Sequence, residues 1–348
     1  MDLPESYFMF CDTLLVFDHV THRIKVLSHV NLDGNIEINY RVAINKIEDL
    51  VNRMNQPLPI KADGIRNPEG TKGFVSNFVR KAYEDSVGKI KEYITAGEAI
   101  QVVLSQRLSK HTTVAPFDVY RALRTINPSP YMFFLDFKDF HIIGASPEMP
   151  VRVENGIVTT RPLAGTRPRG KTPAEDANLE EELRRNEKER AEHIMLVDLG
   201  RNDVGRVSEP GSVVVSDLMN VEKYSHVMHL VTNVQGKLRA DKTCMDALRA
   251  CFPAGTVSGA PKIRAMEIIA EFEPEKRGPY AGAVGYFSSS GNMDMAIAIR
   301  TMVMKNNTAY VQAGGGLVYD SVPGLEFDES MNKARALLKA VEQAEELK

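Results

Sequence analysis

The feature that most constrains the fold of this chain is that many of its extended segments come in pairs joined by short turns. The turn Glu154-Asn155-Gly156 separates two such segments, and Asn and Gly tolerate the left-handed backbone that a tight hairpin requires. Segments 131–137 and 141–146 form a second pair. Strands joined by short turns run antiparallel, so the pattern predicts a mixed, largely antiparallel α+β fold and argues against the βαβ alternation of a Rossmann fold.

Helical and alternating patterns place the other elements around these hairpins. Segment 36–43 is ambiguous, because it begins with strand-like alternation, whereas 44–54 has helical spacing. Further strands are expected at 7–17, 23–30, 100–108, 150–153, 157–161, 213–218, 221–234, 281–288, 294–305 and 308–312, and further helices at 77–96, 117–126, 244–251, 262–272 and 332–347.

One loop divides the chain. Residues 57–73 carry three prolines and three glycines, a composition typical of a linker or exposed loop. We therefore describe residues 1–72 as an N-terminal region of strands and a helix followed by this loop, and 73–348 as the catalytic region. Because the N-terminal strands are expected to pair within the main sheet, we expect the two regions to form one continuous domain.

Composition and charge exclude several classes of protein. The 348 residues are 43% apolar and 26% charged, as in globular proteins with a substantial core. A net charge of −3 without any basic run predicts no nucleic-acid partner. No apolar run is long enough for a membrane span and the first residues are no signal peptide, so we expect a cytoplasmic protein. Cys11, Cys244 and Cys251 match no metal pattern and are expected to be reduced thiols.

Two Glu-x-x-Glu pairs are the main candidates for chemistry. Glu189 and Glu192 share one face of a helix that runs through an apolar segment into 200–203, which we predict to be a loop. Alone, such a pair is usually a solvated face. A second pair, Glu326 and Glu329, precedes the last helix. Two helices that each offer a carboxylate pair could enclose a magnesium ion, which prefers oxygen ligands.

Several further positions carry an open choice between structure and function. Arg300 ends an apolar strand and needs an anionic partner, either a structural carboxylate or a substrate. His229 lies in an apolar run and is either a core histidine or an acid/base. Glu148 follows a strand and would ordinarily be a surface residue. Three glycine-containing segments could approach an anionic ligand or simply be turns: 162–170, 253–262 and 312–316.

Together these segments resemble the chorismate-utilising enzymes, and most closely the anthranilate synthase component I group. The matching motifs cover nearly the whole chain: Gly-Ala-Ser-Pro-Glu (144–148), Pro-Leu-Ala-Gly-Thr-Arg-Pro-Arg-Gly (162–170), Glu-His-Ile-Met-Leu-Val-Asp-Leu-Gly-Arg-Asn-Asp (192–203), Val-Met-His-Leu (227–230), Pro-Ala-Gly-Thr-Val-Ser-Gly-Ala-Pro-Lys (253–262), Arg-Gly-Pro-Tyr-Ala-Gly-Ala-Val-Gly-Tyr (277–286) and Gln-Ala-Gly-Gly-Gly-Leu-Val-Tyr-Asp-Ser (312–321).

The resemblance implies a fold and a reaction. The family has two large packed antiparallel sheets flanked by helices, with the site in a cleft between them. Chorismate, bound with magnesium, takes up ammonia at ring carbon 2 as the 4-hydroxyl leaves, and pyruvate is then eliminated to give anthranilate for tryptophan biosynthesis. The ammonia normally comes from glutamine through an amidotransferase subunit, component II, so the resemblance implies a hetero-oligomer; no glutaminase nucleophile motif is visible here.

Site roles also follow from the resemblance, motif by motif. Glu148 matches the general acid for the departing hydroxyl, and His229 a residue that assists proton transfer at the same end of the ring. Tyr280, Arg300, Gly314 and Gly316 match groups that hold the pyruvyl carboxylate, with Gly165, Thr166, Thr256 and Lys333 lining the rest of the substrate. Glu189, Glu192, Glu326 and Glu329 match the magnesium ligands.

Two positions distinguish this chain from other members of the resemblance. Aminodeoxychorismate synthases typically carry a nucleophilic lysine where this chain has Ala164, and isochorismate and salicylate synthases use a lysine base in the strand where it has Gln101. Ammonia is therefore the consistent nucleophile. These synthases remain the first alternative, and an inactive truncated subunit that only binds a partner or ligand is the second.

The N-terminus departs from the pattern of the resemblance. Anthranilate synthase large subunits usually carry an earlier Leu-Leu-Glu-Ser segment that forms part of a tryptophan feedback pocket, whereas the other half of that pocket, 127–132, is present here. We expect a fragment or shortened chain on which tryptophan acts weakly or not at all.

Overall fold

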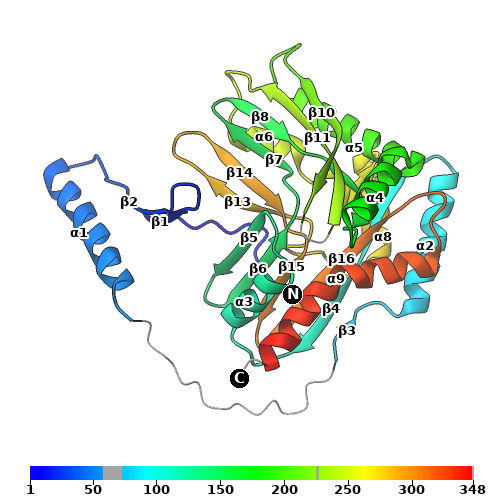
Figure 1. The fold of residues 1–348 in the computed structure, drawn as a ribbon, viewed down its shortest axis with the longest axis horizontal. Helices are drawn as coiled ribbons and strands as arrows, with labels where there is room; N and C mark the ends of the chain where they lie inside the picture. Colours follow the sequence, from blue (N-terminus) through cyan, green and yellow to red (C-terminus); the bar gives the residue numbers. More distant parts are fainter. Residues whose placement is uncertain (58–72, 225–226, 347–348) are drawn as a thin grey trace. The chain divides into compact units, whose positions relative to one another are not determined.

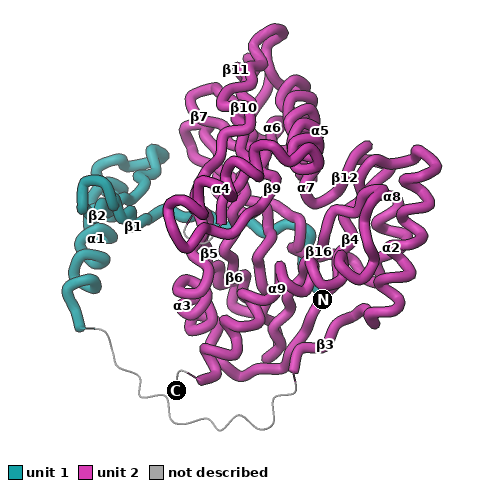
Figure 2. Tube along the Cα trace, turned by 45° about the vertical axis from the view of Figure 1, so that its right-hand side comes forward, with its two compact units in different colours: residues 1–67 teal, residues 68–348 magenta. Residues whose placement is uncertain are grey.

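The computed structural model describes residues 1–57, 73–224 and 227–346, and the chain divides into two compact units, 1–67 and 68–348 (Figure 2). The first unit contains an antiparallel hairpin of β1 (Thr13–Asp18) and β2 (Arg23–Ser28), followed by α1 (Ile36–Met54). Of the Pro/Gly loop expected at 57–73, all but the two end residues lie outside the described residues.

Helix α1 includes the segment whose alternation resembles a strand. Asn35 favours the helix at this segment, because its side chain accepts a hydrogen bond from the Ile38 amide at 3.2 Å and so caps the helix N-terminus. The predicted helix at 44–54 is confirmed, and it begins eight residues earlier than the apolar spacing alone indicates.

The second unit is built on two seven-stranded sheets (Figure 1). Sheet I has the order β10-β11-β8-β7-β14-β13, with β9 also paired to β11, and sheet II the order β12-β4-β16-β15-β6-β5, with β3 also paired to β4. Every strand pair is antiparallel, which confirms the expected α+β class. The strands of sheet I are β7 (Val151–Glu154), β8 (Ile157–Thr160), β9 (Leu163–Pro168), β10 (Val214–Lys223), β11 (Val227–Lys237), β13 (Ala283–Phe287) and β14 (Met293–Ile297). Those of sheet II are β3 (Val75–Ser76), β4 (Gln101–His111), β5 (Tyr131–Asp136), β6 (Phe140–Ser146), β12 (Gly259–Ala260), β15 (Thr301–Lys305) and β16 (Thr308–Leu317).

Helices bury the apolar faces of both sheets. Leu123 and Leu337, from two different helices, join Ile143 and Met302 of sheet II in one buried cluster, and Val197 packs with the valines of sheet I in another. The helices are α2 (Arg80–Thr95), α3 (Pro116–Ile126), α4 (Pro173–Arg185), α5 (Glu187–Gly205), α6 (Cys244–Cys251), α7 (Gly255–Ser258), α8 (Lys262–Phe272) and α9 (Pro323–Glu346). None of the helices described is both long and apolar enough to cross a bilayer, and the three cysteines are unpaired, as expected.

The loop predicted at 200–203 is wrong, because α5 continues through it to Gly205. Gly200 serves close packing there: a Cβ would lie 3.1 Å from the Thr160 methyl group of sheet I. Asp203 is fixed by an ion pair with Lys262 Nζ at 2.9 Å, which joins α5 to the start of α8. The last helix likewise begins at Pro323, not 332, so that it already contains Glu326 and Glu329.

Two predicted strands are each two strands in the structure. The strand expected at 221–234 is interrupted between β10 and β11, and that expected at 294–305 is interrupted after Ile297. The second break carries the chain from sheet I to sheet II, and Arg300 lies in it with φ of +50°. Segment 162–170, expected as a loop, contains strand β9, and β16 extends five residues past 312 through the three glycines.

We predict that Gly314→Ala destabilises the fold by roughly 2 kcal/mol, because a buried Cβ would have to displace backbone. That Cβ would lie 2.3 Å from the Leu104 carbonyl oxygen of the neighbouring strand β4. Gly88→Ala is the matched control: nothing lies within 4 Å of its Cβ position in α2, so it should raise stability by about 1 kcal/mol. Urea unfolding of both variants measures the difference, and an unchanged midpoint for Gly314→Ala would contradict the packing argument.

Candidate active site

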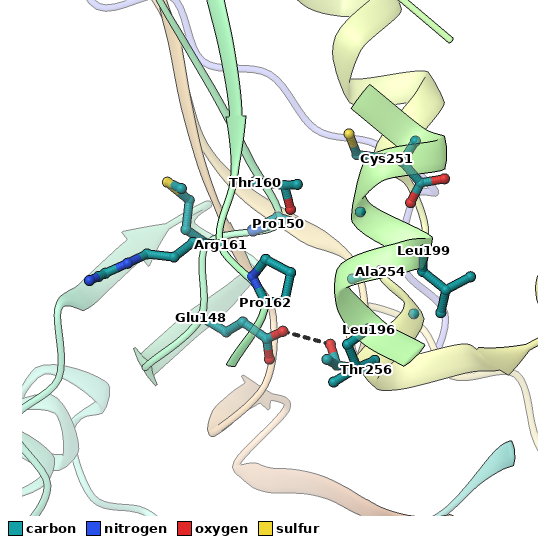
Figure 3. Close-up of a pocket in the computed structure, with 14 residues that line it drawn as sticks. Glu148, Pro150, Thr160, Arg161, Pro162, Leu196, Leu199, Cys251, Ala254 and Thr256 are labelled. Carbon is teal, nitrogen blue, oxygen red and sulfur yellow. Dashed lines mark hydrogen bonds between the residues drawn. The ribbon is translucent and has the colours of Figure 1, made fainter. Parts of the chain in front are cut away.

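Glu148 is a buried acid at the junction of the two sheets. It follows β6 of sheet II and precedes β7 of sheet I, and only 8% of the residue is exposed, so the expectation of a surface residue is wrong. Thr256 of α7 donates to Glu148 Oε1 at 2.8 Å (Figure 3). Burial raises the pKa of Glu148 to about 7, against the hydrogen bond from Thr256 and the charge of Lys333, which both lower it. A carboxyl group with this pKa can hold a proton near neutral pH.

His229 of β11 faces strand β9. Its Nδ1 lies 2.8 Å from the Gly165 carbonyl oxygen and 3.1 Å from Thr166 Oγ1. A carbonyl oxygen can only accept, so Nδ1 carries the proton and the neutral ring keeps a lone pair on Nε2. Burial lowers the pKa of His229, and the nearby charge of Arg300 lowers it further, against the Gly165 hydrogen bond. The neutral, proton-accepting form is therefore favoured.

The four glutamates of the two Glu-x-x-Glu pairs lie on α5 and α9 and interact electrostatically. Burial raises the pKa of Glu192, and the carboxylates of Glu189 on its own helix and Glu329 on α9 raise it further. Burial also raises the pKa of Glu326, with Glu329 again acting in the same direction. Carboxylates of the two pairs therefore lie within electrostatic reach of one another, and a shared metal site at α5 and α9 stays a prediction.

Donors of the chain itself engage three of these carboxylates. Arg167 Nη1 donates to Glu189 at 2.9 Å, Gln101 Nε2 to Glu192 at 3.2 Å, and Lys333 Nζ lies 2.7 Å from Glu329. Glu326 differs, because a hydrogen bond from Ser321 lowers its pKa while its buried Oε2 has no hydrogen-bond partner among the described residues. In the described ranges 1–57, 73–224 and 227–346, no three acidic, histidine or cysteine side chains are already grouped to hold a metal ion.

The glycines of β16 serve two faces of one strand. A Cβ on Gly314 or Gly316 would meet β4, at 2.3 Å from the Leu104 carbonyl and 2.2 Å from Gln101 Nε2. The central Gly315 faces the other way, and its Cβ would lie 3.2 Å from Glu326 Oε2 and 3.6 Å from Glu329 Oε1. The flanking glycines thus permit close strand pairing, and Gly315 leaves room beside the carboxylates.

Arg300 lies near Tyr280, and the charge of each side chain affects the pKa of the other. Burial lowers the pKa of the Arg300 guanidinium, and burial raises that of the Tyr280 hydroxyl to about 12. Among the described side chains Arg300 forms no ion pair, so no structural carboxylate neutralises it. A half-buried cation without a carboxylate favours the second of the two interpretations of Arg300, an anionic ligand.

Glu148 is one of the residues that line a small cavity (Figure 3). Its volume is about 30 Å³, which suits one or two water molecules and not a substituted six-membered ring. Its polar and charged lining comes from Glu148, Thr160, Arg161, Asp203 and Thr256. The cavity therefore adjoins the acid but does not hold a substrate.

Sequence reasoning missed Arg167 and Gly315. A predicted strand at 163–168 would have been the signal for Arg167, which contacts Glu189 at 2.9 Å, although the pairing of β9 with β11 is irregular between Ala164 and Arg167 and does not alternate strictly. Reading 162–170 as a loop removed that signal. Gly315 was concealed in the same way, because β16 was expected to end at 312.

Comparisons with known proteins agree with this arrangement. A family model described as chorismate binding enzyme matches residues 1–339. The chain belongs to the chorismate binding enzyme family. Anthranilate synthase component 1 of Acetivibrio thermocellus is 54% identical over 352 residues, covering 100% of this chain and 71% of the relative. The protein of the same name from Pseudomonas aeruginosa is 53% identical over 345 residues, covering 99% and 70%.

Solved structures of the chorismate binding enzyme family give the same result. The crystal structure of anthranilate synthase component I from Streptococcus pneumoniae matches with a TM-score of 0.85 and 46% identity, over 94% of this chain and 72% of that one. A putative 2,3-dihydroxybenzoate-specific isochorismate synthase from Bacillus anthracis is less similar, with a TM-score of 0.69 and 26% identity over 80% and 76%.

We predict that Glu148 makes the stability of this chorismate binding enzyme depend on pH. The pKa of Glu148 is near 4.5 when unfolded and about 7 when folded, so the folded state binds more protons between these values and stability falls as pH rises. Glu148→Gln cannot titrate at this position, so it does not lose stability in this pH range. Relative to the wild type, Glu148→Gln should gain about 2–3 kcal/mol in unfolding free energy between pH 5 and pH 8.

Chemical denaturation at the two pH values measures this change. Glu154→Gln, at an exposed position of β7, is the matched control and should show no such pH-dependent gain. An equal difference between Glu148→Gln and the wild type at both pH values would contradict the raised pKa.

Proposed function

We propose that this chain converts chorismate and ammonia to anthranilate, pyruvate and water, as the large subunit of an anthranilate synthase. The observation that carries the proposal is its identity of more than 50% to anthranilate synthase component 1 from several organisms over essentially the whole chain. The isochorismate synthase match is far weaker. The geometry of the site supplies the chemical groups that this reaction needs.

The choice of ammonia as nucleophile is supported by two side chains. Ala164 is buried on β9, opposite Leu230, and offers no amine to attack the ring. Gln101 is a neutral amide that donates to Glu192, so it cannot act as the base that activates water. An external amine is the nucleophile consistent with both.

The first half-reaction needs an acid for the leaving hydroxyl. Ammonia forms a bond to ring carbon 2 while the bond from carbon 4 to its hydroxyl breaks, and Glu148 gives that hydroxyl its proton so that water leaves. Burial, which raises the pKa of Glu148 to about 7, keeps a fraction of it protonated at neutral pH. His229, with its Nε2 lone pair, accepts or relays a proton at the same end of the ring.

The second half-reaction restores an aromatic ring. The proton on carbon 2 is removed, the bond between the ring and the enolpyruvyl oxygen breaks, and the released enolpyruvate takes up a proton to become pyruvate. Arg300, Tyr280 and the β16 glycines at 314 and 316 hold the carboxylate of that group, since Arg300 lacks a structural carboxylate partner. The remaining substrate contacts come from Gly165, Thr166, Thr256 and Lys333.

Magnesium is the expected cofactor at the α5 and α9 glutamates. The donors there are carboxylate oxygens, which magnesium prefers, and the buried Glu326 Oε2 has no hydrogen-bond partner in the described part of the chain. The residues therefore fit the ion, although Arg167, Gln101 and Lys333 engage the other three carboxylates. The bound metal would offset the charge of the substrate ring carboxylate and orient it. The ligands would be Glu189, Glu192, Glu326 and Glu329.

A partner subunit is expected to deliver the ammonia. The relatives are named component 1, which indicates an enzyme of more than one component. A glutamine amidotransferase, component II, would supply that ammonia from glutamine, and it would make the complete enzyme a hetero-oligomer. We expect tryptophan biosynthesis in the cytoplasm as its setting.

We predict that the chain forms anthranilate from chorismate, ammonium salt and magnesium without a partner, and that EDTA abolishes the reaction. Glu329→Ala should lower turnover at least about 100-fold by removing a metal ligand, whereas Glu342→Ala, an exposed glutamate of the same helix, should not. Anthranilate fluorescence follows the reaction, and chromatography identifies its product. Isochorismate or aminodeoxychorismate would contradict the proposed reaction, and no turnover at all would favour a subunit that only binds.

We also predict that Thr256→Val moves the alkaline limb of kcat/KM to higher pH. The hydrogen bond from Thr256 lowers the pKa of Glu148, so its removal leaves the acid protonated to a higher pH. The profile is measured at a constant concentration of free ammonia, which removes the titration of ammonium itself. Ser258→Ala, whose hydroxyl binds the Ala254 carbonyl on the same short helix, is the control. A limb that stays in place or moves down would refute the acid role of Glu148.

A further inference from the structure

The chain supplies its own cations to the carboxylates of α5 and α9, and the two cations are held differently. Arg167 contacts Glu189 at 2.9 Å, but its Nη2 also donates to Glu182 of α4 at 2.9 Å. A guanidinium with five donors can therefore lose Glu189 and still keep a carboxylate partner. If a cation displaces Arg167 from Glu189, the guanidinium therefore remains paired with Glu182.

Lys333 has no such second carboxylate in contact within the described ranges. Its Nζ contacts Glu329 at 2.7 Å, and its other hydrogen bond is to the Gly314 carbonyl oxygen at 3.1 Å. Burial raises the pKa of Glu148, Glu192 and Glu326, and in each case the charge of Lys333 opposes that effect. The ammonium group therefore lies among the acid and the carboxylates, and a cation that took Glu329 from it would leave it facing a second positive charge.

We propose that Lys333 couples the binding of the divalent cation to the binding of the anionic substrate. Without ligands it neutralises Glu329 and competes with the cation for that carboxylate. When cation and substrate bind together, a substrate carboxylate replaces Glu329 as its partner. The inference rests on the proposed function, from which it takes the metal and the chorismate carboxylates.

The coupling is thermodynamic and therefore reciprocal. If a substrate carboxylate compensates the displaced ammonium, bound chorismate must raise the affinity for the cation. The bound cation must raise the affinity for chorismate by the same factor. The Lys333–Glu329 pair is partly exposed, with 36% and 50% of the two side chains accessible, so solvent screens it and the effect is moderate. Arg167 competes for Glu189 in the same way but contributes no coupling, because Glu182 retains it.

The test measures Mn²⁺ binding by electron paramagnetic resonance on the whole chain, with and without chorismate, in the absence of ammonium so that no turnover occurs. We expect chorismate to tighten Mn²⁺ about tenfold in the wild type. Lys333→Met should bind Mn²⁺ alone roughly three- to tenfold tighter, and chorismate should then change its affinity by less than about twofold. Arg167→Met should also bind Mn²⁺ alone more tightly but keep the response to chorismate.

Two controls separate charge from fold. Lys339→Met makes the same substitution at an exposed position of α9 and should match the wild type, and Lys333→Arg should restore part of the coupling. Lys333→Met that binds Mn²⁺ no tighter than the wild type, or that keeps the response to chorismate, overturns the inference while wild-type turnover stands. A wild type that neither responds to chorismate nor makes anthranilate overturns the proposed function itself.

Discussion

The site depends on the close pairing of β4 and β16 at three consecutive glycines. The two strands keep register over ten residue pairs, from Thr308 opposite His111 to Leu317 opposite Val102. Gly314 and Gly316 allow this because a Cβ at either would collide with β4, and Gly315 leaves the opposite face open beside the α9 carboxylates. One strand thus combines close pairing with β4 and open space beside the α9 carboxylates. A side chain at Gly314 or Gly316 would disturb the strand pairing, and one at Gly315 would fill the space beside the carboxylates.

Burial, not proximity to a strong charge, sets the protonation of the two proposed acid/base groups. It raises the pKa of Glu148 and lowers that of His229, since in each case the buried environment disfavours the charged form. The same physical cause therefore gives a carboxyl that keeps its proton and an imidazole that carries a proton on Nδ1 but not on Nε2. The Gly165 carbonyl then selects the imidazole tautomer. An acid and a base can coexist in this way near neutral pH without an ion pair between them.

The sequence predicts elements well where the signal is local. Helices at 244–251 and 262–272 have the expected bounds, and the hairpin at Asn155-Gly156 is present. Element boundaries that depend on tertiary structure were predicted wrongly in both directions. Gly200 predicts a helix end, but the helix continues and Gly200 packs against Thr160. The crossing between the two sheets at Arg300 was not predicted, because no glycine or proline marks it in the sequence. The glutamate pairs could be named from the sequence; the donors that engage them, Arg167 above all, depend on which strand faces which helix.

The unequal environments of the four glutamates follow from where each helix meets a sheet. Glu326 is the most buried of the four, beside Gly315, where no donor among the residues described reaches its Oε2. Glu192 is held by an amide, which donates a hydrogen bond but carries no charge. Glu189 and Glu329 lie nearer to solvent and have a cationic partner each. Charge compensation is thus placed at the outer carboxylates, where solvent lowers the cost of exchanging partners. The inner carboxylates retain an electrostatic demand that the proposed divalent cation would satisfy.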